Sequence, residues 1–451
     1  MAISASRERI TKERLERIKA DIEKRHGKPV EQLRDEREKR MNDAIELRIP
    51  DRVPVTIQTG VFSARYAGIP ISAMYYDHAA YREAMLKTIL DFEPDTGASM
   101  VLVNSGTIME LLDTKHQKWP GFNLPDDMPY KFVEGEYMKA DEYDLFLNDP
   151  SDFILRYYLP RIYGILEPVS KLPPFRNMVG GMGFNSILGI FLNPAYKEIA
   201  AKLTKAAEEQ QRLAREGAEF SNAMTYLGYP SQYGTGATGG LAGGGVGQAP
   251  FDTISDSLRG MRGAMLDMYR CPDKLLAACD KILEWRIAQV VPVKPDAHGY
   301  RRRAGMPLHR GSDGFMSIKQ FEKFYWPTLK KAILTNIDLG YISAPFWEGI
   351  WDDRLEYLLE LPKGKVVFHN EKTDIFRAKE ILGDHMCIQG GVPPTILQAG
   401  SPQDVEEHCK KLIKTVGKNG GFILGPGSAI DYAKPENIKS MVDSAKKYGW
   451  Y

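Results

Sequence analysis

The feature that most constrains this chain is the alternation of short apolar runs with amphipathic segments through its C-terminal half. Short apolar runs bounded by Gly and Pro are typical of buried strands, and segments with a helical period are typical of helices that cover them. Parallel strands need crossover connections, usually helices, so the alternation predicts a parallel sheet. A chain of 451 residues accommodates about eight such units. We therefore predict an α/β fold, a (β/α)8 TIM barrel with an N-terminal helical extension.

The individual elements follow from the same pattern. The predicted strands are Val53–Ile57, Ser99–Val103, Gly340–Trp347, Val366–Phe368, Met386–Gln389 and Phe422–Leu424. The predicted helices are Ala80–Asp91, Pro194–Glu216, Pro272–Val290, Ile318–Leu339, Arg354–Leu361, Thr373–Leu382, Pro402–Val416 and Pro435–Tyr448. Ser401 is expected to cap one helix, with Pro402 at its first position and Gly417 past its end.

The first 45 residues differ in composition from the rest. Residues 1–40 hold 13 Lys or Arg and 9 Asp or Glu. Ile10, Leu15, Ile18 and Ile22 give this segment one narrow apolar stripe, which favours a charged helix laid on the main body or on a partner subunit. We predict two parts: a charged helical N-terminal extension over residues 1–45 and the barrel over residues 46–451.

Charge and cysteine usage exclude several classes of protein. A formal charge of +1 argues against a nucleic-acid binder. No apolar run predicts a membrane span, and the first residues lack the apolar core of a signal peptide. The cysteines Cys271, Cys279, Cys387 and Cys409 form no Cys-x-x-Cys pair, which favours a reducing compartment. We expect a cytoplasmic protein, with Cys387 acting as a small buried hydrophobe.

The Gly-rich segment 234–247 does not resemble a phosphate-binding loop. It has no Gly-Lys-Ser/Thr, and the next helix is expected to begin only near Asp252. A lid-like or closely packed loop is the favoured interpretation.

Polar residues gather where the predicted C-terminal strands end. Glu348 follows one strand, His369 ends the next, and Glu371 comes two residues later. In a parallel barrel these positions meet on one face, which carries the active site. A His and two carboxylates suit a zinc site with an open position, and they equally suit a general acid–base pair. Gln389 and Ser428 occupy the neighbouring strand ends, whereas His309, His385 and His408 have no patterned neighbours.

Several segments resemble the uroporphyrinogen decarboxylase superfamily. They are RIPDRVPV (48–55), DFEPDTGA (91–98), PFDTISDSLRGMRGAMLDMYRCPDKLL (250–276), CIQGGVPPTILQAGSPQDVEEHCKKLI (387–413) and GGFILGPGSAIDYAKPENIKSMVDSAKKYG (420–449). The resemblance runs from about residue 45 to the end of the sequence. It implies a (β/α)8 barrel and makes a homodimer an expectation.

The superfamily has two functional branches. Uroporphyrinogen decarboxylases carry an Arg-rich Met-Arg-Gln-Ala-Gly-Arg segment after the first strand, where this chain has GVFSARYAGIP with Arg65 alone. Cobamide-dependent methyltransferases of the coenzyme M type carry His-x-Cys and Pro-Gly-Cys. Those positions fall on His369-Asn370-Glu371 and Pro426-Gly427-Ser428, so both thiolates are missing.

A His/Glu zinc is more Lewis acidic than a thiolate-bound zinc, and it is better matched to an ether oxygen. The chain is similar in this respect to the methyltransferase component of aryl ether O-demethylases. The resemblance implies a metal site with Glu and His ligands, and Glu348, twenty-one positions before His369, fits that spacing. Ile333 stands where a further carboxylate ligand would be expected.

The resemblance implies a methyltransferase that moves a methyl group from an aryl methyl ether to the Co(I) corrinoid of a separate carrier protein, because the chain has no Asp-x-His-x-x-Gly corrinoid motif. It implies Glu348, His369 and Glu371 as zinc ligands or acids, Asp313 as a further polar catalytic group, and four substrate-binding residues: Phe346, Trp347, Gln389 and Ser428.

Two alternatives stay open. One is a metal-free decarboxylase in which Arg65 and Arg301–Arg303 bind substrate carboxylates. The other is a non-catalytic barrel that acts as a binding subunit through its charged N-terminal helix.

Overall fold

A parallel sheet forms the centre of the computed structural model, which describes residues 11–57, 60–97, 105–180, 182–231 and 244–451. Five strands follow one another in chain order across this sheet: β3 (Arg303–Leu308), β4 (Ile342–Trp347), β5 (Val367–Asn370), β6 (Cys387–Val392) and β7 (Phe422–Pro426). All four pairings are parallel. A separate antiparallel pair consists of β1 (Gln117–Lys118) and β2 (Lys131–Phe132).

The sheet continues past β7 toward the first predicted strand. Val55 bridges Leu424 in parallel fashion, and the backbone N–H of Thr56 donates to the Leu424 carbonyl at 2.9 Å. Residues 53–57 thus lie at a strand position but make only bridges, not a full strand as we predicted. The predicted strand Ser99–Val103 lies outside the described residues. Within the described ranges, the sheet is an open, curved wall.

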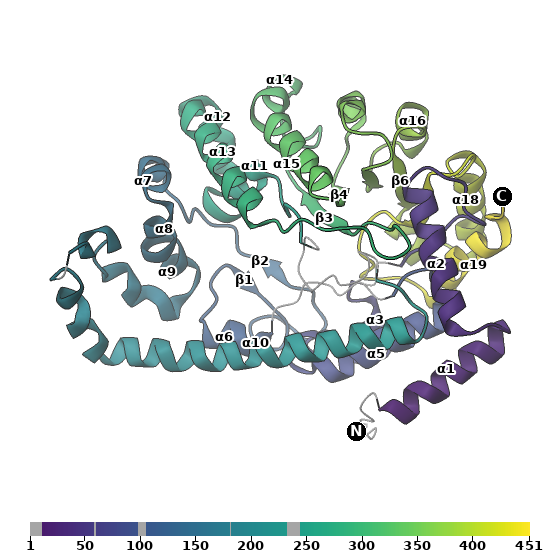
Figure 1. The fold of residues 1–451 in the computed structure, drawn as a ribbon, viewed down its shortest axis with the longest axis horizontal. Helices are drawn as coiled ribbons and strands as arrows, with labels where there is room; N and C mark the ends of the chain where they lie inside the picture. The colour runs from purple at the N-terminus through teal and green to yellow at the C-terminus, as the bar shows by residue number, and fades with distance from the viewer. Residues whose placement is uncertain (1–10, 58–59, 98–104, 181, 232–243) are drawn as a thin grey trace.

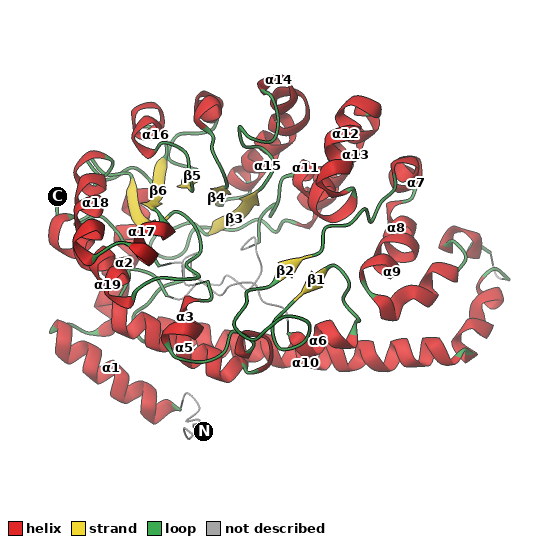
Figure 2. Ribbon diagram, turned by 180° about the vertical axis from the view of Figure 1, so that it is seen from behind, coloured by secondary structure: helices red, strands yellow, loops and turns green. Residues whose placement is uncertain are grey.

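Helices of the C-terminal half lie along the outer side of this wall, whereas the long helix α10 (Pro194–Tyr226) runs along the opposite side of the molecule (Figures 1 and 2). The α-helices of the described residues differ in length. Those of at least ten residues are α1 (Lys12–His26), α2 (Val30–Ile45), α5 (His78–Phe92), α10 (Pro194–Tyr226), α12 (Gly260–Arg270), α13 (Pro272–Gln289), α15 (Trp326–Asp338), α18 (Pro402–Thr415) and α19 (Pro435–Tyr448). The shorter α-helices are α3 (Phe62–Tyr66), α4 (Ala73–Tyr76), α6 (Gly106–Leu111), α7 (Tyr143–Asn148), α8 (Pro150–Phe153), α9 (Leu159–Ile162), α11 (Pro250–Thr253), α14 (Ile318–Gln320), α16 (Ile375–Leu382) and α17 (Pro394–Ala399).

The remaining helical turns are of the 3₁₀ and π types. The 3₁₀ segments are η1 (Ala140–Glu142), η3 (Gly164–Lys171), η4 (Phe175–Met178), η5 (Phe184–Leu192) and η8 (Asp352–Glu360), and the π segments are η2 (Ile154–Tyr158), η6 (Ile254–Leu258) and η7 (Phe321–Tyr325). Pro160 and Pro327 each follow a π segment closely, and proline removes the N–H that a continuous α-helix would need. No helix among the described residues is both long enough and apolar enough to cross a bilayer.

Most predicted C-terminal elements are confirmed to within a few residues. Ser401 caps α18 as expected, because its hydroxyl accepts a hydrogen bond from the N–H of Asp404. The predicted helix Arg354–Leu361 is instead the 3₁₀ segment η8. Strand β3 was missed, since its sequence RAGMPL follows an arginine run and contains both Gly and Pro, which are rare inside strands.

The second N-terminal helix packs against the amino-terminal end of the sheet rather than lying free in solvent. Met41, Ala44 and Ile45 of α2 form a buried cluster with the strand residues Ile342, Val367, Cys387 and Ile423. These strand residues stand at or near the start of β4, β5, β6 and β7. Helix α2 therefore closes the amino-terminal end of the sheet, which leaves the carboxyl end for a site. Cys387 is a buried core residue, as predicted.

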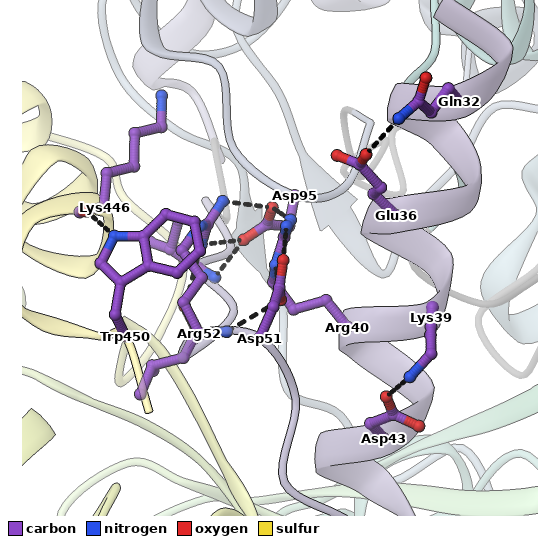
Figure 3. A network of polar contacts seen from close by, with 12 residues as sticks. Gln32, Glu36, Lys39, Arg40, Asp43, Asp51, Arg52, Asp95, Lys446 and Trp450 are labelled. Atoms are coloured by element: carbon purple, nitrogen blue, oxygen red, sulfur yellow. Dashed lines mark hydrogen bonds and ion pairs between the residues drawn. The ribbon is translucent and has the colours of Figure 1, made fainter.

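A buried ion-pair network fixes α2 to the start of the barrel (Figure 3). Asp95 is 1% exposed, and its carboxylate lies 2.6 Å from Arg40 Nη1 and 2.8 Å from Arg52 Nη2. The same carboxylate accepts the backbone N–H of Val55 at 2.8 Å. These contacts hold the pKa of Asp95 down to about 2, although burial alone would raise it. One carboxylate thus joins α2, the first strand position and the chain after α5.

Replacing Asp95 by Asn should lower the free energy of unfolding by about 3–5 kcal/mol, because two buried guanidinium groups would lose their counter-charge. Asp51 is the matched control, since it pairs with Arg40 but is 44% exposed; Asp51→Asn should cost at most about 1 kcal/mol. Urea denaturation at pH 7 measures both.

The pH dependence gives a second readout of the same network. The pKa of Asp95 is lowered in the folded state, so its stabilisation is present above the ordinary value of 3.8 and is lost as the pH falls toward about 2. Wild-type stability should fall more steeply over that range than the stability of Asp95→Asn. Equal slopes would show that Asp95 does not carry this stabilisation.

Candidate functional site

A cavity of about 1560 Å³ lies over the inner face of the sheet. Its floor includes Met41 and Ile45 of α2, and its upper wall includes Glu348, which follows β4. Aromatic, acidic and basic side chains share the lining: Tyr130, Phe146, Tyr158, Asp256, Trp285, Arg286, Arg303, His309, Arg310, Phe346, His369 and Gln389. A cavity of this kind, apolar for the most part with a few convergent polar groups, is the usual setting of a small-molecule site.

Strand periodicity selects which side chains enter the cavity. Phe346, His369 and Gln389 stand opposite one another across β4, β5 and β6, and all three line the cavity. Because successive side chains point to opposite faces, Trp347 lies on the other face. There it is fully buried against Trp351 and Phe368. The predicted substrate contacts Phe346 and Gln389 therefore reach the cavity, whereas Trp347 packs in the outer core.

His369 is a buried, neutral imidazole. Its ring contacts the Phe346 ring edge-on, with centroids 4.9 Å apart, and it is hydrogen-bonded to the backbone of Pro426. Burial lowers the pKa of His369 to about 4, because the charged form would lose its solvation. Neutral imidazole is the form that binds a metal or accepts a proton.

The two predicted glutamates differ in their surroundings. The Glu348 side chain is 46% exposed and lines the cavity, and its pKa is raised by partial burial, with the nearby Glu371 carboxylate adding to the effect. The Glu371 side chain is 14% exposed, and its carboxylate accepts the backbone N–H of Gly349 at 2.7 Å. Glu371 thus holds the loop after β4, directly beside Glu348.

Asp313 and Ser428 lie outside the lining of the cavity. The Asp313 carboxylate pairs with the buried Arg354 and accepts the backbone N–H of Asp353. Ser428 follows β7, and its neighbour Ala429 is the residue that lines the cavity. The contact with Arg354 gives Asp313 a structural role in this arrangement.

An acid–base group that the sequence did not reveal stands next to Glu348. His309 follows β3, and its Nδ1 lies 2.6 Å from an Asp256 carboxylate oxygen. Its Nε2 lies 3.7 Å from Glu348 Oε2. The second Asp256 oxygen accepts Nη2 of Arg310 at 3.0 Å. Burial lowers the pKa of His309, but the hydrogen bond and charge of Asp256 outweigh it, so the pKa is raised.

Asp252 fixes the backbone that carries His309. It is fully buried and accepts the backbone N–H groups of His309 and Arg310, at 2.9 and 3.0 Å, and the Tyr325 hydroxyl at 2.7 Å. Burial raises the pKa of Asp252 to about 6, with the neighbouring Asp256 adding to the effect. Our statement that His309 has no patterned neighbours was therefore wrong: its partners come from the segment 250–258, more than fifty residues earlier. The Asp-x-x-x-Asp spacing within PFDTISD was the available signal.

The expected zinc ligands do not form a complete set. Among the described residues, no group of three or more His, Cys, Asp and Glu side chains is arranged to hold a metal ion. His369 and Glu348 line the cavity, but Glu371 is engaged with Gly349. A catalytic zinc takes three protein ligands, so this arrangement does not fit one. Zinc stays a prediction from the sequence, to be tested by elemental analysis of the wild type beside His369→Ala.

The arginines of the decarboxylase alternative are dispersed. Arg65 stacks on the Tyr432 ring and donates to the Asp127 carbonyl, and Arg301 donates to the Gly340 carbonyl. Of Arg65 and Arg301–Arg303, Arg303 is the one within the described lining of the cavity. In the Gly-rich segment 234–247, residues 234–243 lie outside the described residues. Of the described part, Gly244, Gly245 and Gly247 line the cavity.

Replacing Asp256 by Asn should lower the pKa of His309, because the main group that favours the imidazolium would lose its charge. Proton NMR titration of the imidazole signals, with His309→Gln to assign the resonance, measures this pKa. Ser255→Ala, which removes a neutral neighbour of Asp256, is the control and should leave the titration in place. An unchanged His309 titration in Asp256→Asn would contradict the pairing.

The chain is similar in sequence to uroporphyrinogen decarboxylases. Residues 239–448 match the family model described as uroporphyrinogen decarboxylase (URO-D). A uroporphyrinogen decarboxylase of Chlorobium phaeovibrioides is 38% identical over 79 residues, covering 16% of this chain and 22% of that protein. One of Syntrophotalea carbinolica is 23% identical over 177 residues, covering 39% of this chain and 49% of that protein. The matched regions thus span from about a fifth to about half the length of these relatives.

The fold has a solved counterpart. A methyltransferase from Methanosarcina mazei superposes with a TM-score of 0.53 at 14% sequence identity, over 91% of this chain and 98% of that one. At this identity the likeness concerns the fold. The α/β barrel class predicted from the strand–helix alternation is confirmed. The matched residues 239–448 include all five strands of the described parallel sheet, so the likeness to the uroporphyrinogen decarboxylase family model covers that sheet.

Proposed function

We propose that this protein is a methyltransferase that takes the methyl group of an aryl methyl ether and passes it to the Co(I) corrinoid of a separate carrier protein. The observation that carries the proposal is the pairing of His309 with Asp256 beside Glu348, in a cavity with aromatic walls. The fold shared with the Methanosarcina mazei methyltransferase supports the same class of reaction.

The chemical difficulty of the reaction lies in the leaving group. When the methyl carbon is attacked, the bond to the aryl oxygen breaks, and that oxygen keeps the electron pair as a phenolate. A proton donor near this oxygen stabilises the developing charge and releases the product as a phenol. The corrinoid supplies the nucleophile, so the chain itself has to bind the ether and donate one proton.

His309 is the proton donor that the geometry favours. Asp256 holds the imidazole through Nδ1 and raises its pKa, which favours the imidazolium, and Nε2 faces Glu348 and the cavity, where it can donate a proton. Glu348, with its raised pKa, is placed to return a proton to His309 from solvent. The neutral His369 and the Phe346 ring form the wall against which an aromatic donor can pack.

Replacing His309 by Gln should reduce the rate of methyl transfer from methoxybenzene by about 10²–10⁴-fold, the usual contribution of a positioned general acid. The decay of the Co(I) absorbance of a reduced carrier protein measures this rate. His298→Gln, a change on an exposed loop, is the control. Full activity in a folded His309→Gln variant would refute the assignment.

The rate should also fall as the pH rises through the raised pKa of His309, because the imidazolium is the active form. In Asp256→Asn this fall should begin at a lower pH. A rate that rises over the same range would point to His309 as a base.

A decarboxylase is the second candidate, because the matched relatives are uroporphyrinogen decarboxylases and the cavity is large. Release of CO₂ from uroporphyrinogen without any carrier protein would favour it over the methyltransferase.

A further inference from the structure

The cavity contains an arginine that has no counter-ion among the described residues. Arg286 lies in the last turn of α13 and lines the cavity. Its Nη2 donates to Thr253 Oγ1 at 2.8 Å and to Gln248 Oε1 at 3.2 Å, both neutral acceptors. Among the described residues, no carboxylate lies within ion-pair distance of it, and its Nε and Nη1 have no partner.

This environment is unfavourable to a lone cation. Burial lowers the pKa of Arg286, and the distant Asp252 only partly offsets this effect. Arg310, in the same cavity, differs because it pairs with Asp256 at 3.0 Å. A half-buried guanidinium that lines the cavity, with no described carboxylate at ion-pair distance, has unused capacity to bind an anion from outside.

Arg286 belongs to the same hydrogen-bonded group as His309. Gln248, which accepts from Arg286, donates through Nε2 to Asp256 Oδ2 at 3.1 Å, and that same oxygen contacts His309. An anion held at Arg286 is therefore anchored to the frame that positions the proton donor.

The walls around Arg286 are aromatic. Trp285 and Phe146 meet edge-on with centroids 5.4 Å apart, and both line the cavity together with Tyr158 and Ile282. A guanidinium in such a wall suits a flat apolar molecule with one negative group at its edge.

We propose that Arg286 binds the carboxylate of the substrate, so that the methyl donor is an aryl methyl ether with a carboxylate on its ring. This assignment rests on the proposed function for the ether, but the anion subsite itself does not require methyl transfer. The carboxylate end of the ring sits at Arg286, and the methoxy end extends toward His309 and Glu348.

Binding of 4-methoxybenzoate and methoxybenzene, measured by calorimetry or by quenching of tryptophan fluorescence without carrier protein, tests the subsite. Wild-type protein should bind 4-methoxybenzoate at least about tenfold more tightly than methoxybenzene. Arg286→Gln should abolish this preference, and Arg286→Lys should retain part of it. Arg262→Gln is the matched control, because Arg262 is exposed on the adjacent helix α12 and should leave the preference intact.

Three results would overturn the assignment: equal binding of the two probes by the wild type, an undiminished preference in folded Arg286→Gln, or tighter Arg286-dependent binding of inorganic phosphate than of benzoate. If Arg286→Gln does not fold, the wild-type probe comparison and Arg286→Lys still decide.

The methyl-transfer assay separates this proposal from the proposed function. Arg286-dependent binding of benzoate with no methyl transfer from any ether would refute the methyltransferase and leave the subsite. Equally fast methyl transfer from methoxybenzene and 4-methoxybenzoate, at equal concentrations below saturation, would support the methyltransferase and refute the carboxylate subsite at Arg286.

Discussion

The buried carboxylate of Asp95 is the contact on which the arrangement of this molecule depends. It neutralises Arg40 and Arg52 at once and accepts the backbone N–H of Val55. Through these contacts the helix α2 is held against the amino-terminal end of the sheet, where Met41 and Ile45 close the floor of the cavity. The same helix thus packs on the strand starts and supplies part of the cavity lining.

The same network includes residues of the two N-terminal segments that resemble the uroporphyrinogen decarboxylase superfamily. Asp51 and Arg52 belong to RIPDRVPV, and Asp95 belongs to DFEPDTGA. Their roles are structural: they hold charges that balance one another inside the protein. A third segment, PFDTISD, serves the site instead, because Asp252 fixes the backbone of His309 and Asp256 orients its ring.

The alternation of side chains along the parallel strands determines which residues reach the cavity. Phe346, His369 and Gln389 occupy matched positions on three adjacent strands, so their side chains share the cavity. Trp347 is one residue away and faces the opposite layer. The acid–base group is completed from outside the sheet, where His309 at the end of β3 meets Asp256 of η6 and Glu348 of the next strand end.

The sequence by itself determined the α/β class, most helices and four of the five strands of the parallel sheet, because these depend on local periodicity and on capping residues such as Ser401. It also brought Glu348, His369, Phe346 and Gln389 forward, since strand ends can be recognised locally. The tertiary structure alone decided that His309 pairs with Asp256, that Arg286 lines the cavity with no counter-ion among the described residues, and that Asp313 pairs with Arg354. These contacts join residues between about forty and fifty-five positions apart or depend on which way a helix faces, and ion pairs of this kind leave no periodic trace in a sequence.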